Sequence, residues 1–233
     1  KRPPAHPPLG TRSEPAASPI SLELVARFQS YDPKSDGYDL EVSSPKSAAA
    51  HPRKPWVYIQ SLEAKKTLVF DTRTRAKVGT VSHDFKAEHD PLFAGISEPP
   101  GVGFPDSVET ATRNVFSGKP VEAAFSHGGR YLYVPYYRRD YDAQGALPSA
   151  MAVIDTRKSK GGEIVRVIPT GPISKYVATA PNGKILAVSN WGDNTLHLLD
   201  ISSKTAKGFR YLGRLVVEKP LPLEGITGDR DHE

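Results

Sequence analysis

A segment of about 45 residues recurs in this chain, and this repeat constrains the fold more than any other feature of the sequence. Three stretches align without gaps: AAAHPRKPWVYIQ (48–60), AAFSHGGRYLYVP (123–135) and ATAPNGKILAVSN (178–190). Each contains small or apolar residues, a tight turn and an alternating apolar strand, and each is followed by a further strand that ends in Asp. Self-similarity at a fixed period is the sequence signature of repeat architectures.

Two insertions hide the constant period of the repeat. Asp155 and Asp200, which end equivalent strands, lie 45 residues apart. Ser126 and Ala180 lie 54 residues apart, of which nine belong to a longer hairpin in the second repeat, and this leaves 45. His51 and Ser126, which are equivalent positions in the first and second repeats, lie 75 residues apart, and this separation exceeds the period by 30 residues. The insertions fall at about residues 84–116 and 136–149.

The period and the four short strands in each unit predict an all-β fold, a β-propeller of four-stranded antiparallel blades. The clear blades are expected at about residues 48–83, 119–170 and 171–218, within a domain that covers residues 20–233. Helical solenoids are excluded because Pro, Gly and β-branched residues interrupt every unit. Propellers have about four to eight blades, so we expect the chain to contain part of a ring that further sequence or a partner chain completes.

Composition narrows the possible functions. Residues 1–19 include six prolines and predict an extended tail or linker. The chain has no cysteine, which excludes disulfides, thiolate metal sites, cysteine nucleophiles and covalently attached c-type haem. The sequence contains no apolar stretch long enough to predict a transmembrane helix. A net charge of +5 is too small to indicate a nucleic-acid partner by itself.

The repeats resemble the YVTN family of bacterial β-propeller repeats. The resemblance rests on SHGGRYLYV, APNGKILAVSNWGDNTLHLLDIS and MAVIDTRKSKGGEIVRVIPTG, and it covers about residues 48–83 and 119–218. In the first repeat, His51-Pro52-Arg53-Lys54 replaces the Ser-Pro-Asp-Gly turn of the family pattern. The resemblance implies a periplasmic, cell-surface or secreted bacterial protein that binds rather than catalyses, and it transfers no catalytic residue.

Both insertions are predicted to lie on one side of the propeller. Connections from the second to the third strand, and from an outer strand to the next inner strand, emerge on the same face because the strands alternate in direction. Long loops on a rigid scaffold are where binding sites are usually built, and Tyr and Arg are enriched in binding hot spots. Lys119 and Asn194 emerge on the same face. The candidate partner-binding residues are Tyr136, Tyr137, Arg138, Arg139, Tyr141, Lys175, Trp191 and Asp193.

The sequence leaves three alternatives open. Pairing of Asp140 and Asp142 with the neighbouring arginines would make the 136–149 insertion a self-packed loop. Arginine beside tyrosine also suits a nucleic acid, although the two aspartates and the small net charge oppose that partner. A metal-binding or enzymatic propeller would use the 83–90 cluster. The weak candidate metal ligands there are His83, Asp84, His89 and Asp90.

No motif indicates a catalytic site or a cofactor. The G-x-S-x-G and H-E-x-x-H patterns are absent, and the glycines at 101–103 and 161–162 lack the strand–turn–helix setting of a phosphate loop. Asp71, Asp155 and Asp200 are predicted to accept hydrogen bonds from turn amides. We therefore predict a non-enzymatic, exported propeller, without a cofactor, that binds a protein or cell-envelope component through its insertions.

Overall fold

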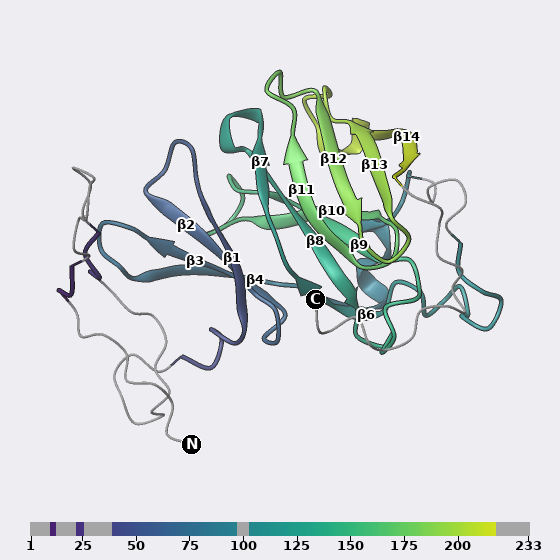
Figure 1. Cartoon of the computed structure of the whole chain (residues 1–233), viewed down its shortest axis with the longest axis horizontal. Coiled ribbons are helices and arrows are strands. Elements are labelled where there is room, and N and C mark those ends of the chain that lie inside the picture. Colours follow the sequence, from purple (N-terminus) through teal and green to yellow (C-terminus); the bar gives the residue numbers. More distant parts are fainter. Residues whose placement is uncertain (1–9, 13–21, 26–38, 97–102, 218–233) are drawn as a thin grey trace. The chain divides into compact units, whose positions relative to one another are not determined.

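The computed structural model describes residues 10–12, 22–25, 39–96 and 103–217, drawn in colour in Figure 1. The chain divides into two compact units, Lys1–Val42 and Ser43–Glu233. In the first unit Arg12 and Glu23 form an antiparallel bridge and an ion pair of 2.9 Å. Most of the tail expected at residues 1–19 lies outside the described residues.

Three antiparallel sheets repeat one pattern in the second unit (Figure 1). Sheet 1 contains β1 (Pro45–Ala50), β2 (Trp56–Ser61), β3 (Lys66–Asp71) and β4 (Lys77–Ser82). Sheet 2 contains β7 (Ala124–Ser126), β8 (Tyr131–Arg139), β9 (Ala150–Asp155) and β10 (Glu163–Pro169), with β5 (Asp84–Phe85) and β6 (Phe116–Pro120) added. Sheet 3 contains β11 (Ser174–Thr179), β12 (Ile185–Asn190), β13 (Thr195–Asp200) and β14 (Arg210–Val216). The predicted all-β fold of four-stranded antiparallel units is confirmed.

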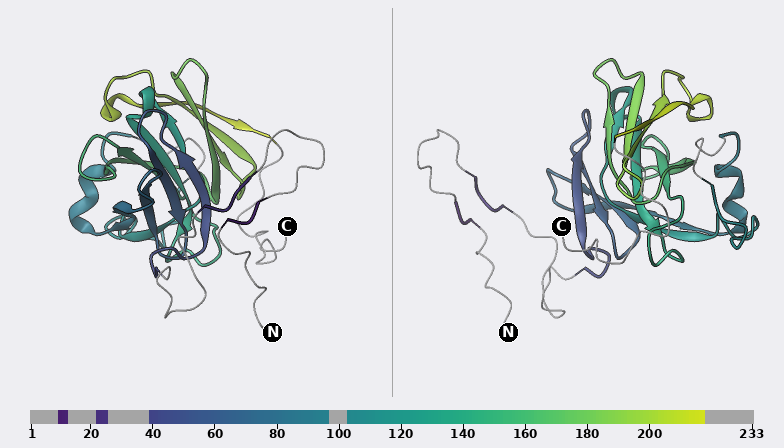
Figure 2. Two further views of the ribbon diagram at one scale, coloured as in Figure 1. Left: turned by 90° about the vertical axis from the view of Figure 1, so that its left-hand side faces the viewer. Right: turned by 45° about the vertical axis from the view of Figure 1, so that its right-hand side comes forward.

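Helical structure in the described residues is limited to three short 3₁₀ segments, η1 (Ala87–Leu92), η2 (His127–Gly129) and η3 (Ala206–Gly208). In both views of Figure 2 η1 lies at the periphery of the strands. Among the described residues, none of the helical segments has the length and apolar composition of a membrane-spanning helix.

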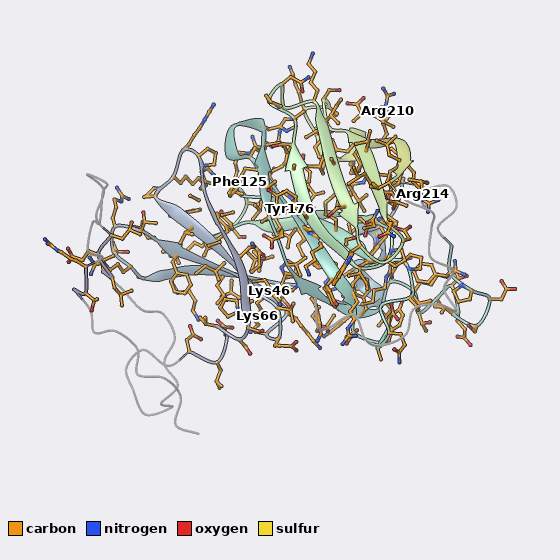
Figure 3. All side chains as sticks on the ribbon, in the orientation of Figure 1. Lys46, Lys66, Phe125, Tyr176, Arg210 and Arg214 are labelled. Atoms are coloured by element: carbon orange, nitrogen blue, oxygen red, sulfur yellow. The ribbon has the colours of Figure 1, made fainter. Side chains whose placement is uncertain are left out.

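The inner strands of the three sheets are neighbours. The hydroxyl of Ser47 in β1 donates to the carbonyl of Val121, just before β7, at 2.6 Å. The hydroxyl of Thr179 in β11 donates to the carbonyl of Phe125 in β7 at 3.1 Å. Figure 3 labels one side chain from each inner strand, Lys46, Phe125 and Tyr176. The first strands of successive repeats therefore meet, as they do around the axis of a ring.

Both faces of sheet 2 are buried. Successive side chains of a strand point to opposite sides of a sheet, so each strand contributes residues to both faces. On one side Leu132 and Val134 pack in a cluster with Tyr58 and Val69 of sheet 1. On the other side Tyr131 and Tyr133 pack in a second cluster with residues of sheet 3. The sheet 3 members include Val177, Leu186, Val188 and Leu199. Burial of each such large side chain contributes roughly 1.5–3 kcal/mol.

The end of β8 differs from the corresponding ends of β2 and β12. β8 has nine residues where β2 and β12 have six, and its last residues pair with β6 at Pro120↔Tyr136 and Gly118↔Arg139. The first four residues of the 136–149 insertion are therefore strand rather than loop. They are paired with the strand that follows the other insertion.

The Asp that ends each third strand stabilises the following turn, as predicted. Asp71 Oδ1 accepts the amides of Arg73 and Thr74 at 2.8 and 3.1 Å. Asp155 and Asp200 accept the amides two residues further on, at 3.1 and 2.9 Å. Hydrogen bonds from Thr74 and Arg73 lower the pKa of Asp71 below its ordinary value. These carboxylates are thus committed to turn structure.

Candidate functional site

Four of the predicted partner-binding residues line one cavity. Tyr137 and Arg138 of β8, Lys175 of β11 and Trp191, directly after β12, surround a volume of about 330 Å³. The side chain of Arg138 is fixed there by a hydrogen bond from Nη1 to the carbonyl of Ala143. The remaining lining residues are Ser44, Lys46, Leu62, Glu63, Lys119, Val121 and Glu122. We refer to this volume as the basic cavity.

The basic cavity lies where equivalent ends of the three sheets meet. Lys46 and Lys175 are near the beginnings of inner strands, and Glu122 lies just before the inner strand β7. Glu63 and Trp191 follow the ends of second strands. Because the strands alternate in direction, these positions lie at one end of each sheet, the end from which the 136–149 insertion emerges. The predicted proximity of the insertion to Lys175 and Trp191 is thereby realised.

Positive charge predominates in the basic cavity, where four cationic side chains face two carboxylates. One carboxylate is neutralised, since Lys119 Nζ lies 3.0 Å from Glu63 Oε1. Burial raises the pKa of Glu122 above its ordinary value, although the charges of Lys175 and Lys46 oppose this change. The cavity therefore favours anionic ligands.

Two aromatic rings form part of the wall. Lys175 Nζ lies 4.3 Å from the centroid of the Trp191 ring and 5.9 Å from that of Tyr137. Such cation–π contacts stabilise the ammonium over the ring face. Lys175 and Trp191 also line a neighbouring hollow of about 450 Å³ with Tyr176, Leu196 and Val217 among its other residues. We refer to it as the apolar hollow.

Tyr136 and Arg139 lie in the interior, so the predicted role at a partner surface does not fit them. Both side chains are buried, with 0% and 1% of their surface exposed. Tyr136 packs against Gly118 of β6, where an added Cβ would lie 2.7 Å from the ring. Arg139 Nε donates to the carbonyl of Pro148 at 3.0 Å, and its guanidinium lies 4.4 Å from the Phe116 ring centroid. The pairing of β6 with β8 covers these residues.

The insertion is self-packed, and its two aspartates bond to backbone amides and to a lysine. Asp140 accepts the Ser117 amide at 2.8 Å and lies 3.6 Å from Lys65 Nζ. Asp142 accepts the amides of Ala146 and Leu147 at 3.1 and 2.9 Å. These bonds close the loop on itself and on β6.

Tyr141 connects the two insertions and remains 41% exposed. Its hydroxyl donates to the carbonyl of Arg113 at 3.0 Å, and Arg139 Nη1 donates to the same carbonyl. The two insertions therefore lie against each other. Tyr141 is held outside the basic cavity.

Asp193 is not part of the lining of either volume. It is 8% exposed, accepts the hydroxyl of Thr195 at 2.7 Å and pairs with Arg214 at 3.2 Å. Asp193 was predicted to bind a partner, but its carboxylate forms its contacts with Thr195 and Arg214 of sheet 3.

The four weak metal candidates have separate partners. His83 is buried between Thr67 and Tyr136. Asp84 accepts the Ser117 hydroxyl at 2.6 Å, and His89 Nδ1 accepts the Lys86 amide at 2.9 Å. Asp90 Oδ1 accepts the side-chain amide of Asn114 at 2.8 Å. In the described part of the chain, no three His, Cys, Asp or Glu residues are grouped to hold a metal ion.

Lys46 and Glu122 were not predicted as site residues. Each stands alone in the sequence near the beginning of an inner strand and looks like an ordinary surface residue. The only signal in the sequence is position in the repeat, because the same end of each unit contributes to the lining.

Comparisons with known proteins identify the fold. No family model matches the chain, and no curated protein matches it. A protein from Bacteroides fragilis described provisionally as a 6-phosphogluconolactonase has a TM-score of 0.52 and 15% identity, over 77% of this chain and 41% of its own. Hydrazine synthase from Kuenenia stuttgartiensis has a TM-score of 0.51 and 15% identity, over 83% and 41%. Saccharomyces cerevisiae Sqt1 has a TM-score of 0.51 and 12% identity, over 78% and 38%.

The chain has a β-propeller fold. It spans about two-fifths of the length of these solved structures. At such identities the likeness extends to the arrangement of the propeller blades, which here are the three sheets.

Proposed function

We propose that this propeller is a non-enzymatic binding protein that docks a partner, a protein or cell-envelope component, at the basic cavity. The proposal rests on one observation: Tyr137, Arg138, Lys175 and Trp191, from two different blades, line the same positively charged cavity. Trp, Tyr and Arg are enriched among the few residues that supply most of the binding energy at protein interfaces. A cavity built on paired strands holds these side chains in place before binding, which lowers the entropic cost of association.

We further propose that the repeats are of the YVTN type and that the protein is exported to the periplasm, cell surface or medium. The turn of the third blade supports the repeat type, since Gly183 has a φ of 67° and the Lys184 amide bonds to Asn182 Oδ1 at 2.9 Å. The Gly183 amide also donates to the carbonyl of Ala180 at 2.8 Å, so Pro181 and Asn182 are the central residues of a turn that ends at glycine, as in the Ser-Pro-Asp-Gly pattern.

Site-specific photo-crosslinking tests the docking proposal. A photoreactive amino acid at position 137 should give covalent adducts with the partner in cells of the source organism. The same amino acid at positions 158 and 204, in the exposed turns at the opposite end of the blades, is the matched control. Adducts at 158 or 204 with none at 137 would place the docking surface elsewhere.

A second candidate function is hydrolysis of an anionic lactone. Glu122 favours it, because a carboxyl with a raised pKa beside Lys46 and Lys175 suits general acid–base catalysis. One of the similar structures bears a provisional lactonase description. The test is hydrolysis of 6-phosphogluconolactone above the spontaneous rate. Enzymatic activity that disappears in Glu122→Gln would establish this function in place of simple binding.

A further inference from the structure

The Lys175–Trp191 pair is a wall shared by two volumes of opposite character. On one side lies the basic cavity of about 330 Å³, and on the other the apolar hollow of about 450 Å³. The ammonium and the ring are in contact at 4.3 Å. A ligand that straddles this pair would place one group among cations and another against apolar side chains.

The basic cavity has hydrogen-bond donors without acceptors among the described residues. Within residues 39–96 and 103–217, no carboxylate oxygen forms an ion pair with Lys46 or Lys175, whereas Lys119 is paired with Glu63. The buried Nε of Arg138 also has no hydrogen-bond partner there. A carboxylate accepts several such donors at once.

The apolar hollow exposes large side chains. Tyr176 is 61% exposed and Val217 is 65% exposed, and Leu196 and the Trp191 ring lie beside them. Contiguous exposed apolar surface beside a charged rim is typical of protein interaction sites. An apolar side chain placed here would remove this surface from water.

We propose that the ligand is an extended protein segment carrying an acidic side chain and, two residues later or earlier, an aromatic or large aliphatic side chain. The acidic group enters the basic cavity, and the apolar group packs in the hollow against Trp191 and Tyr176. Side chains two residues apart on an extended strand lie on the same side and about 6.6 Å apart, which suits two volumes with a common wall. This proposal rests on the proposed docking function and specifies the chemistry of its partner.

One carboxylate in the lining opposes a nucleic acid as the occupant. Glu122, which is not paired with Lys119 as Glu63 is, would repel a continuous phosphate backbone, whereas a single acidic side chain meets an excess of cations. The protein segment is therefore favoured, and single-stranded DNA becomes an outcome of the test.

The test is a titration followed by the fluorescence of Trp191, in a Trp56→Phe background that leaves it as the single tryptophan. The probes are short synthetic peptides with Glu and Phe two residues apart, the same peptide with Lys for Glu, the same peptide with Ala for Phe, and oligo-dT. The Glu-Phe peptide should bind roughly tenfold or more tightly than either substituted peptide. Equal binding of all peptides, tighter binding of oligo-dT, or no binding of the Glu-Phe peptide would overturn the proposal.

A charge exchange separates recognition from loss of folding. The variant Lys46→Glu/Lys175→Glu should lose the Glu-Phe peptide and bind the Lys-Phe peptide, while Lys158→Glu/Lys204→Glu should bind as the parent protein does. A folded variant that keeps the parent's preference would also overturn the proposal. If crosslinking at position 137 succeeds while the peptide preference is absent, the docking function stands and only the ligand chemistry is wrong.

Discussion

The hydroxyl of Tyr136 lies 2.9 Å from Nδ1 of His83, and neither side chain reaches solvent. His83 Nε2 lies 2.7 Å from Thr67 Oγ1, and that hydroxyl donates to Gln60 Oε1 at 2.5 Å. Since the Thr67 proton is used on Gln60, the histidine proton must lie on Nε2, and Nδ1 accepts from Tyr136. The chain of bonds joins blade 1 to blade 2 and requires a neutral imidazole.

The first prediction is that acidification destabilises the protein through its buried histidines. Burial lowers the pKa of His83 to about 3 and that of His197 to about 4, from 6.5. Between these values and pH 6.5 the unfolded chain binds more protons than the native protein, so stability falls as the pH falls. Each histidine contributes at most about 1.4 kcal/mol per pH unit. Urea unfolding at several values between pH 7 and pH 4.5 should show this slope, and His83→Gln should reduce it. An unchanged slope in that variant would exclude His83 as the cause.

The second prediction contrasts two adjacent tyrosines. Tyr136→Ala should lower the free energy of unfolding by roughly 3–5 kcal/mol, because it empties a core position and leaves His83 without its donor. Tyr137→Ala should change the free energy of unfolding by no more than about 0.5 kcal/mol, as most surface substitutions do, and it should weaken partner binding. Denaturant unfolding and a binding titration on both variants provide the measurement. Similar stabilities for the two variants would contradict the burial of Tyr136.

The repeat made much of this fold predictable. Alternating apolar residues followed by Asp identified third strands such as Thr195–Asp200. The position of Tyr136 could not be predicted in the same way. Its burial depends on β6, a strand at residues 116–120 with no counterpart in the other two sheets, and no local pattern specifies that pairing.

The candidate site was predictable only in part for a related reason. Tyr137, Arg138 and Trp191 stand out in the sequence because aromatic and arginine side chains interrupt a polar loop or follow a strand. Lys46 and Glu122 do not stand out, because their importance arises from the meeting of separate repeats in space. Arg139 stands out equally, but its strand position turns it inward.

The third prediction concerns Arg139, which holds the two insertions together. Its guanidinium bonds to the carbonyls of Arg113 and Pro148 and lies over the Phe116 ring. Arg139→Lys should not hold the two insertions together, because an ammonium lacks the planar guanidinium group that bonds to several carbonyls at once. Limited proteolysis should cut within residues 140–149 faster in this variant than in the parent. Arg75→Lys, in the exposed turn after β3, is the control and should leave the cleavage rate unchanged.

The fourth prediction tests the packing between blades 1 and 2. A Cβ on Gly79 would overlap the backbone oxygen of Lys160, so Gly79→Ala should destabilise the protein by about 1–3 kcal/mol. Gly213 in β14 is the matched control, because no atom lies within 4 Å of the position that an added methyl group would take. Gly213→Ala should leave stability within about 0.5 kcal/mol of the parent. Thermal or urea unfolding of both variants decides between the outcomes.

The most direct test of the binding role is a measurement of affinity for the partner that crosslinking at position 137 identifies. The variant to be measured combines Tyr137→Ala, Arg138→Ala and Trp191→Ala. Loss of one such anchor typically costs about 2 kcal/mol, so the account predicts a decrease in affinity of roughly thirtyfold or more with the fold retained. The control, Lys158→Ala with Lys204→Ala at the opposite end, should bind as tightly as the parent. Full affinity in the cavity variant together with weakened binding in the control would contradict the account.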